Sequence, residues 1–259
     1  MSELSSGKGH RDENFPVASV LIAPRHRVRV LAFYRIARQA DDIADHPTAP
    51  ASEKLARLAA IEASVTDRHL LDLLHAFRQD VVKSRYADWD ELIDYCRWSA
   101  APVGRFMLDV HGESTALWPA SDALCAALQV INHLQDCAKD YRDLNRVYLP
   151  QDALAAAGVD VTALGAPAAS PALRGVIADL ARRCQALLAD SRVLAGEVRD
   201  LRLSMEIGVI HRLAESLAAR LIAGDPLSRR IRHTRLETAW LALVGAAGAL
   251  GSRGRMGHR

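Results

Sequence analysis

Apolar residues recur every three or four positions along most of the chain, and runs of β-branched residues are scarce. This spacing places the apolar side chains on one face of an α-helix, whereas a half-buried strand alternates with a period of two. The pattern therefore predicts an all-α protein whose core lies between helices. The predicted helices cover residues 24–45, 52–77, 88–111, 121–142, 171–199, 202–223 and 228–250.

Several of these helices begin at residues that favour a helix start. Pro24 fits a first turn, where the helix needs no backbone N–H from that residue. Asp88 and Ser121 can each accept a hydrogen bond from the unpaired N–H groups of a first turn. Ser170 followed by Pro171 combines both features, so the sequence predicts helix N-termini at these places.

The chain shows no internal repeat with a period of about 20–50 residues and no break in composition, which favours a single domain over residues 1–259. Half of the residues are hydrophobic, enough to build a sizeable core. Residues 1–12 and 252–259 are expected to form flexible tails. The segment 158–170 is interpreted as a loop.

Charge and hydropathy narrow the classes of function. The formal net charge is only +2, so composition offers no argument for binding nucleic acid. The polar N-terminus lacks the apolar stretch of a secretory signal, and no apolar run reaches the ~18 residues of a membrane-spanning helix. We therefore expect a cytoplasmic protein. The apolar segment 239–250 is interpreted as a buried last helix, with peripheral contact to the inner membrane as the alternative.

A polar stripe runs along the segment QVINHLQDCAKDYRDLNRVYLP, residues 129–150. Its members are spaced three or four residues apart and so share one face of a helix. These members are Gln129, Asn132, Asp136, Asp140 and Asp143. The rest of the helix is apolar and suited to packing, with Ala127, Val130, Ile131, Leu134, Cys137, Ala138 and Tyr141.

The simplest interpretation of such a stripe is a solvent-exposed face, but two observations argue against it. Exposed faces usually carry Glu, Lys and Arg, whereas Asn and Asp lower helix propensity. A second acidic group also lies upstream, in RQADDIAD. There Asp41 and Asp45 are one turn apart, and Arg38 lies one turn before Asp41. Two such motifs on separate helices are far more specific than one.

The two acidic motifs predict a metal and an anion. Carboxylates that face one another repel unless a cation lies between them. Oxygen ligands suit Mg²⁺, which binds through carboxylates, water and phosphate oxygens. Arg38, Arg146 and Lys139 are candidates to hold phosphate oxygens directly. We therefore expect a magnesium–diphosphate site inside a helical bundle, with diphosphate as the leaving group.

These residues resemble the squalene/phytoene synthase family. The segment FYRIARQADDIAD (33–45) is similar to the family's first motif, and QVINHLQDCAKD with the closing RVYLP (129–150) is similar to its second. YCRWSAAPVG (95–104) and ENFPVAS (13–19) correspond to further family segments. The recognisable similarity covers about residues 13–150. It implies an isoprenoid-synthase-type helical bundle with a central cavity.

Details at LQD (134–136), SAA (99–101) and NFPV (14–17) resemble one branch of that family. This branch converts presqualene diphosphate and water to hydroxysqualene and diphosphate in bacterial hopanoid biosynthesis, as a carbon–oxygen lyase. The resemblance implies a Mg²⁺-dependent enzyme that works beside partner enzymes of the squalene pathway. No tyrosine follows Tyr148, so a late aromatic of the family is missing. Two interpretations stay open: its loss weakens stabilisation of a carbocation, or it leaves room for the water that ends the reaction.

The resemblance also implies roles for individual residues. The expected metal ligands are Asp41, Asp45, Asp136, Asp140 and Asn132. The four aspartates and Tyr148 are the expected catalytic residues. The expected substrate-binding residues are Arg38, Gln129, Asn132, Arg146 and Phe33, and Trp98 is a further candidate to line the cavity.

Three alternatives stay open. A head-to-head synthase would join two prenyl diphosphates to give presqualene diphosphate, squalene or phytoene. A head-to-tail chain-elongating enzyme is disfavoured because DCAKD (136–140) lacks a doubled aspartate. A catalytically silent helical scaffold would be expected to lose motif carboxylates, and all four are present here.

The remaining motifs carry no predicted chemistry. The ten histidines include no H-x-x-x-H pair with a third ligand near it in sequence. His111, His133 and His211 are therefore expected to be packing or surface residues rather than zinc ligands. The basic segment SRRIRHTR (228–235) is interpreted as an exposed helix face, with an anion site as the alternative.

Overall fold

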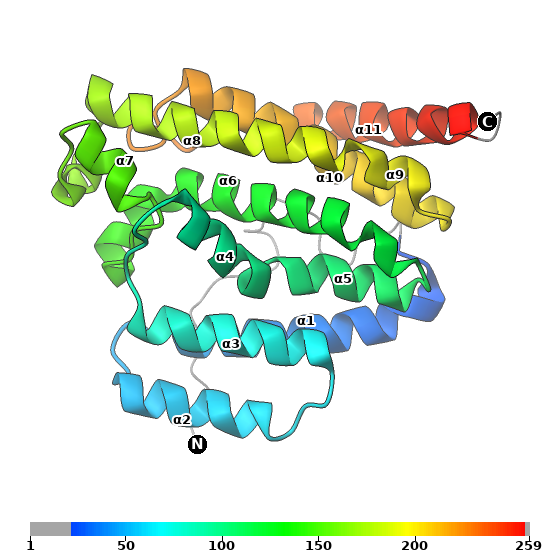
Figure 1. The fold of residues 1–259 in the computed structure, drawn as a ribbon, viewed down its shortest axis with the longest axis horizontal. Helices are drawn as coiled ribbons and strands as arrows, with labels where there is room; N and C mark the ends of the chain where they lie inside the picture. The colour runs from blue at the N-terminus through cyan, green and yellow to red at the C-terminus, as the bar shows by residue number, and fades with distance from the viewer. Residues whose placement is uncertain (1–21, 257–259) are drawn as a thin grey trace.

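The fold is an all-α bundle of layered helices (Figure 1). The computed structural model describes residues 22–256, and no strand occurs among them. The elements are α1 (Pro24–Ala44), α2 (Ala51–Glu62), α3 (Arg68–Val82), α4 (Trp89–Ser99), α5 (Ala101–Val110), η1 (Thr115–Leu117), α6 (Trp118–Leu144), α7 (Gln151–Ala156), η2 (Val161–Gly165), α8 (Pro171–Asp190), η3 (Ser191–Val193), α9 (Leu194–Glu197), α10 (Leu201–Ala223) and α11 (Arg235–Met256).

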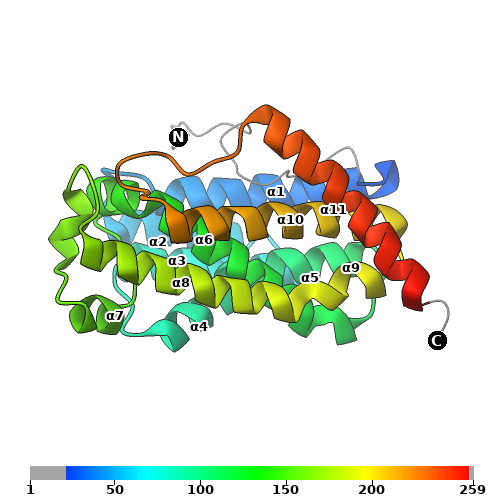
Figure 2. The same cartoon turned by 90° about the horizontal axis from the view of Figure 1, so that it is seen from above.

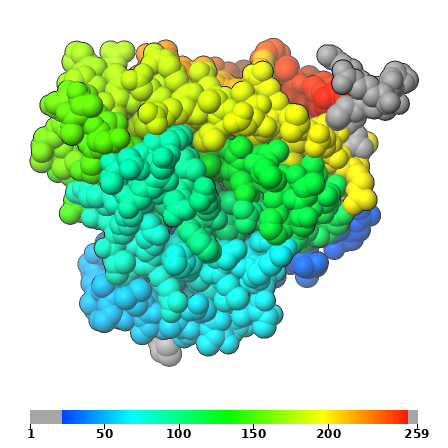
Figure 3. Space-filling view, viewed as in Figure 1, coloured from blue at the N-terminus to red at the C-terminus, as the bar shows by residue number. Residues whose placement is uncertain are grey.

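Helix α6 lies at the centre of the bundle. It packs against α4 and α5 on one side and against α8 and α10 on the other. Helix α1 packs mainly on α3 and α2, which form the opposite edge of the molecule. The space-filling view shows α2 and α3 at the lower edge of this face and α8 at the upper edge, with α4 and α5 between them (Figure 3). The two acidic motifs thus lie on helices from different layers.

Three of the predicted helix starts are confirmed. Pro24 occupies the first turn of α1. The side chain of Asp88 accepts a hydrogen bond from the N–H of Glu91 at 2.9 Å, and that of Ser170 accepts from Leu173 at 3.2 Å. The prediction for Ser121 is wrong, because α6 begins three residues earlier and Ser121 is buried inside it.

Two long predicted helices are each divided in the structure. Residues 52–77 form parts of α2 and α3, because the side chain of Asp67 accepts hydrogen bonds from His69 and Leu70 and starts a new helix. Residues 88–111 are divided at Ala100, since Pro102 in the first turn of α5 has no N–H to continue the hydrogen bonds of α4.

The C-terminal half also departs from the predicted boundaries. The helix expected at 171–199 ends at Asp190 and continues as η3 and α9. Residues 228–234 are not helical and Ile231 is buried, so SRRIRHTR does not form the exposed helix face that the sequence suggested. Helix α11 runs through Met256, so part of the expected tail is helical. The expected tail at 1–12 lies outside the described residues.

Helices α10 and α11 cross at very close range. A Cβ atom on Gly208 would lie 2.5 Å from the carbonyl oxygen of Gly245, so only glycine allows this approach. One side of α11 is thereby packed on α10 (Figure 2). The other side exposes Leu236, Trp240 and Leu243. Within residues 22–256, no helix is both long and apolar enough to cross a bilayer.

Candidate active site

Two adjoining cavities lie between the layers of the bundle. The first is polar, with a volume of about 160 Å³. The second is apolar and larger, with a volume of about 390 Å³. Asp41 of α1 and Phe77 of α3 line both cavities. The arrangement suits a molecule with a charged head and a long apolar body.

The polar cavity collects the residues of both acidic motifs. Helix α1 contributes Asp41 and Asp45 from its C-terminal end, and α6 contributes the stripe. The motif residues that line this cavity are Asp41, Asp45, Gln129, Asn132, Asp136, Asp140, Arg146 and Tyr148. The packing side of α6 is buried as the sequence predicted, from Ala127 to Ala138. The stripe is therefore not an exposed face, although the roles of its members stay predictions.

Two of the expected substrate-binding residues lie on the wall of the apolar cavity. Phe33 is buried there and stacks on Phe106, with ring centroids 3.9 Å apart. Arg38 lies at the border with the polar cavity and pairs with Asp41 at 3.2 Å and with Asp42 at 2.8 Å. Trp98 does not line either cavity. It is partly exposed, and its ring packs against the imidazole ring of His75 at the surface.

The last residue of the stripe lies outside the cavity. Asp143 forms an ion pair with Lys139 at 3.2 Å, and both side chains are about half exposed. Helix α6 ends at Leu144, and the C-cap residue Asn145 adopts a left-handed conformation. The interpretation of Lys139 as a phosphate-binding residue is therefore not supported by its position.

Arg146 is the centre of a buried network. Its Nη1 atom lies 2.9 Å from the Asp45 carboxylate, and it also donates to the Tyr148 hydroxyl at 3.3 Å. Its Nη2 atom donates to the backbone carbonyl of Asp80 at 2.9 Å. Because protein acceptors occupy both terminal nitrogens, Arg146 orients and neutralises the carboxylates of the site in this structure.

Asp80 of α3 is a site residue that the sequence analysis missed. The hydroxyl of Tyr95 donates to one Asp80 oxygen at 2.8 Å, and that of Tyr148 donates to the other at 3.2 Å. Burial raises the pKa of Asp80 to about 6, and Arg146 opposes this shift. One feature of the sequence could have revealed it: Asp80 continues the apolar stripe that Phe77 belongs to, where a carboxylate needs a partner.

His133 is a packing residue, as expected, but it also belongs to the site. It is buried, but it lines the polar cavity. The Gln129 amide donates to its Nε2 atom at 3.1 Å, and its ring stacks on Tyr148 with centroids 3.4 Å apart. Burial, followed by the charge of Arg146, lowers the pKa of His133 to about 3. The ring is therefore neutral at neutral pH and fixes the Tyr148 ring in place.

The electrostatics of the cavity call for a cation. Burial, then the charges of Asp136 and Asp45, raise the pKa of Asp140 to about 7. Clustered carboxylates of this kind are stabilised by a cation between them. The donors are oxygens from carboxylates and from the Asn132 amide, which is the ligand set that suits Mg²⁺. The residues therefore fit a magnesium site.

Replacing Asp140 by asparagine is expected to stabilise the metal-free protein at about pH 8 by about 2–4 kcal/mol. The raised pKa means that the folded state holds a proton that the unfolded state has lost, so wild-type stability falls as pH rises from about 4 to 7. The difference in the free energy of unfolding between the variant and the wild type should shrink by more than half at about pH 5. Urea unfolding in EDTA measures it, and a pH-independent difference would contradict this account.

Comparison with known proteins assigns the family. The model of the squalene/phytoene synthase family matches residues 9–68 and 62–237. The chain belongs to the squalene/phytoene synthase family. A hydroxysqualene synthase from Rhodopseudomonas palustris is 54% identical over 91% of this chain and 88% of its own length. One from Zymomonas mobilis is 50% identical over 95% of this chain and 91% of its own length.

Solved structures confirm the isoprenoid-synthase fold expected of the family. The squalene synthase HpnC from Alicyclobacillus acidocaldarius superposes with a TM-score of 0.69 at 30% identity, covering 82% of this chain and 89% of that one. A dehydrosqualene synthase superposes with a TM-score of 0.75 over 93% of both chains, at 18% identity, and so supports the fold alone.

Proposed function

We propose that this chain converts presqualene diphosphate and water to hydroxysqualene and diphosphate. One observation carries the proposal. A carboxylate-lined cavity adjoins a larger apolar cavity, and Asp41 and Phe77 line both. This pairing matches a substrate with a diphosphate head and a C30 hydrocarbon body. The proposal is also supported by the high sequence identity of this chain to proteins named hydroxysqualene synthase.

The polar cavity would hold the diphosphate. Asp41, Asp45, Asp136, Asp140 and Asn132 would hold Mg²⁺, which when bound supplies the positive charge that stabilises diphosphate as a leaving group. Arg38, on the wall of the apolar cavity and paired with Asp41, would contact the diphosphate. Arg146 would hold the Asp45 carboxylate in position through their ion pair at 2.9 Å. The stacked Tyr148 and His133 form a rigid wall behind these groups.

The apolar cavity would hold the hydrocarbon. Its wall includes Phe33, Phe106 and Leu128, which exclude bulk water from the reacting carbon atoms. The ring faces of the two phenylalanines attract a carbocation by about 0.5–2 kcal/mol each. This environment would let the cyclopropylcarbinyl cation rearrange before a single water captures it.

Glu206 of α10 is suited to direct that water. It is buried on the wall of the apolar cavity, where its carboxylate can orient a water oxygen toward the cation and accept the proton that the water loses. Glu206→Gln is expected to lower the share of hydroxysqualene and raise the share of hydrocarbons formed by proton loss. Ser204→Ala, two residues away and outside the cavity wall, is the control. An unchanged product ratio, measured by gas chromatography, would exclude this role.

Product analysis tests the proposed function and separates the alternatives. Purified protein receives presqualene diphosphate or farnesyl diphosphate, with Mg²⁺ and without NADPH. The expected result is hydroxysqualene from presqualene diphosphate and no product from farnesyl diphosphate. Condensation of farnesyl diphosphate would identify a head-to-head synthase instead. No turnover of either compound, in protein that is folded, would favour a silent scaffold.

Contact with the cytoplasmic side of the inner membrane is a further part of the proposal. The exposed residues Leu236, Trp240 and Leu243 of α11 share one face of the helix. Such a face suits the surface of a bilayer that stores a hydrocarbon product and carries partner enzymes of the squalene pathway. Sedimentation with phospholipid vesicles, lost on changing Trp240 and Leu243 to serine, would support it. Equal sedimentation of both proteins would refute it.

A further inference from the structure

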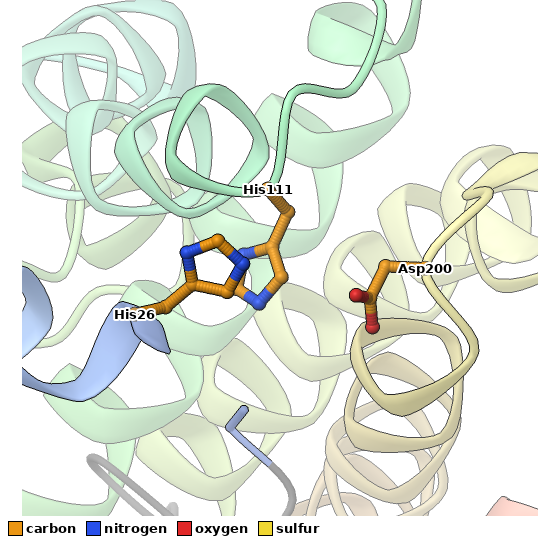
Figure 4. Close-up of side chains that lie close together, drawn as sticks. All are labelled: His26, His111 and Asp200. Atoms are coloured by element: carbon orange, nitrogen blue, oxygen red, sulfur yellow. The ribbon is translucent and has the colours of Figure 1, made fainter. Parts of the chain in front are cut away.

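A second cluster of chemically capable side chains lies at the opposite end of α1 from the acidic motif. His26 belongs to the first turn of α1, His111 follows α5 directly, and Asp200 caps α10. One ring nitrogen of each histidine and one Asp200 oxygen lie within 4.8 Å of one another. Figure 4 shows the two rings side by side, with the Asp200 carboxylate projecting toward them. From the sequence alone, His111 is expected to be a packing or surface residue.

The protonation of His111 suits a metal ligand. Its Nδ1 atom lies 2.8 Å from the carbonyl oxygen of Met107, which only accepts, so Nδ1 carries the proton. In the neutral ring the Nε2 atom then has the lone pair, and this atom is buried with no hydrogen-bond partner among residues 22–256. Histidines that bind metals usually donate their other ring N–H to a carbonyl or carboxylate in this way.

A cationic group already contacts the other two members of the cluster. Arg25 donates from Nε to His26 Nε2 at 2.9 Å and from Nη2 to Asp200 Oδ2 at 3.4 Å. Because a guanidinium only donates, His26 Nε2 also carries a lone pair. The Arg25 side chain is 71% exposed, so it can turn into solvent when a metal ion takes its place.

Asp200 is held in position by groups outside the cluster. The buried carboxylate of Glu113 accepts hydrogen bonds from the backbone N–H of Arg199 at 3.0 Å and of Asp200 at 2.8 Å. Glu113 lies two residues after His111, so these bonds tie the ligand-bearing segments together. One Asp200 oxygen caps α10 through Arg202 and Leu203, which leaves the other oxygen directed at the cluster.

We propose that His26, His111 and Asp200 bind a divalent transition-metal ion of the zinc type. Two imidazoles and one carboxylate are a common zinc ligand set with a fourth position for water. Ligands about 2.1 Å from a tetrahedral zinc lie roughly 3.4 Å apart, and small side-chain rotations of these partly exposed residues bring them to that spacing.

The ion would act as a clamp on the end of the apolar cavity. Ile22, four residues before His26, and Leu203, three residues after Asp200, both line that cavity. The ion would join the start of α1, the end of α5 and the start of α10, which are the elements that close the cavity at this end. This role is independent of the diphosphate chemistry at the other end of α1.

Metal titration of the full-length, tag-free protein tests the proposal. Zn²⁺ is added in the presence of excess Mg²⁺, which would compete for the acidic site, and Co²⁺ serves as a spectroscopic probe. The expected result is one Zn²⁺ per chain and the absorption of tetrahedral Co²⁺. His26→Ala and His111→Ala should each weaken binding at least about tenfold, since loss of even an outer-shell partner costs about 10–100-fold. His75→Ala, an exposed histidine on α3, is the matched control.

Two further variants keep the proposal open to refutation if a histidine variant does not fold. Arg25→Ala should tighten Zn²⁺ binding, because it removes the competing cation. Asp200→Asn keeps the cap of α10 but should weaken binding. The proposal is overturned if the wild-type protein binds no Zn²⁺ under these conditions. It is equally overturned if Arg25→Ala and Asp200→Asn both bind like the wild type.

Discussion

Asp136→Asn is expected to lower turnover of presqualene diphosphate at least about a hundredfold while the protein stays folded. Asp136 lines the polar cavity on α6, opposite the acidic end of α1. The change keeps the shape of the side chain but removes one of the charges that would hold Mg²⁺ against the diphosphate. Loss of one group that stabilises a developing negative charge costs about 10²–10³ in rate. Steady-state product formation at saturating Mg²⁺ is the measurement.

Asp143→Asn is the matched control for this prediction. Asp143 lies on the same polar stripe, two turns further along, but it is exposed and paired with Lys139 outside the cavity. The control should keep wild-type turnover. Equal loss in both variants would show that net charge on α6, rather than ligation in the cavity, governs activity, and undiminished turnover by Asp136→Asn would remove the proposed metal site.

Arg146→Met is expected to destabilise the protein by about 3–5 kcal/mol near pH 8 in EDTA, which is the usual cost of leaving a buried charge without its partner. Arg146 is the cation beside the buried carboxylates of Asp45 and Asp80. The loss should be smaller near pH 5, because the pKa of Asp80 is already raised to about 6 and protonation removes its charge. Urea unfolding monitored by circular dichroism gives the free energies.

Arg142→Met serves as the control for the loss of Arg146, since Arg142 is an exposed arginine in the last turn of α6, four residues before Arg146. We expect a change of less than about 0.5 kcal/mol there, as for most surface substitutions. If both variants lost the same small free energy, Arg146 would not be the residue that compensates the buried carboxylates. The contacts around Asp80 would then contribute little to the free energy of unfolding.

Local periodicity was enough to find the acidic part of the site. Asp41 and Asp45 lie one turn apart on α1, and the stripe from Gln129 to Asp140 needed only the geometry of a helix. Both groups line one cavity as their spacing suggested. Asp143 shares the stripe but not the cavity, because its half-exposed side chain pairs with Lys139, although the next residue, Leu144, lines the cavity.

Some helix boundaries and some site residues depend on tertiary contacts and could not be predicted from the sequence. The apolar period continues through residues 63–67 and 100, so two helix ends were missed, although Asp67 and Pro102 were visible in the sequence as helix-starting residues. The burial of Asp80 and His133 depends on Arg146, Tyr95 and Tyr148 from other segments. Three separate elements contribute to the cluster of His26, His111 and Asp200, so no spacing along the chain predicts it.

Calorimetry of diphosphate binding tests the central claim most directly. If the two acidic helices hold one diphosphate through divalent ions, inorganic diphosphate should bind with one-to-one stoichiometry in millimolar Mg²⁺. It should release no binding heat in EDTA, or with Asp41→Asn in Mg²⁺. Diphosphate that binds equally well without Mg²⁺, or that does not bind in its presence, would contradict the account.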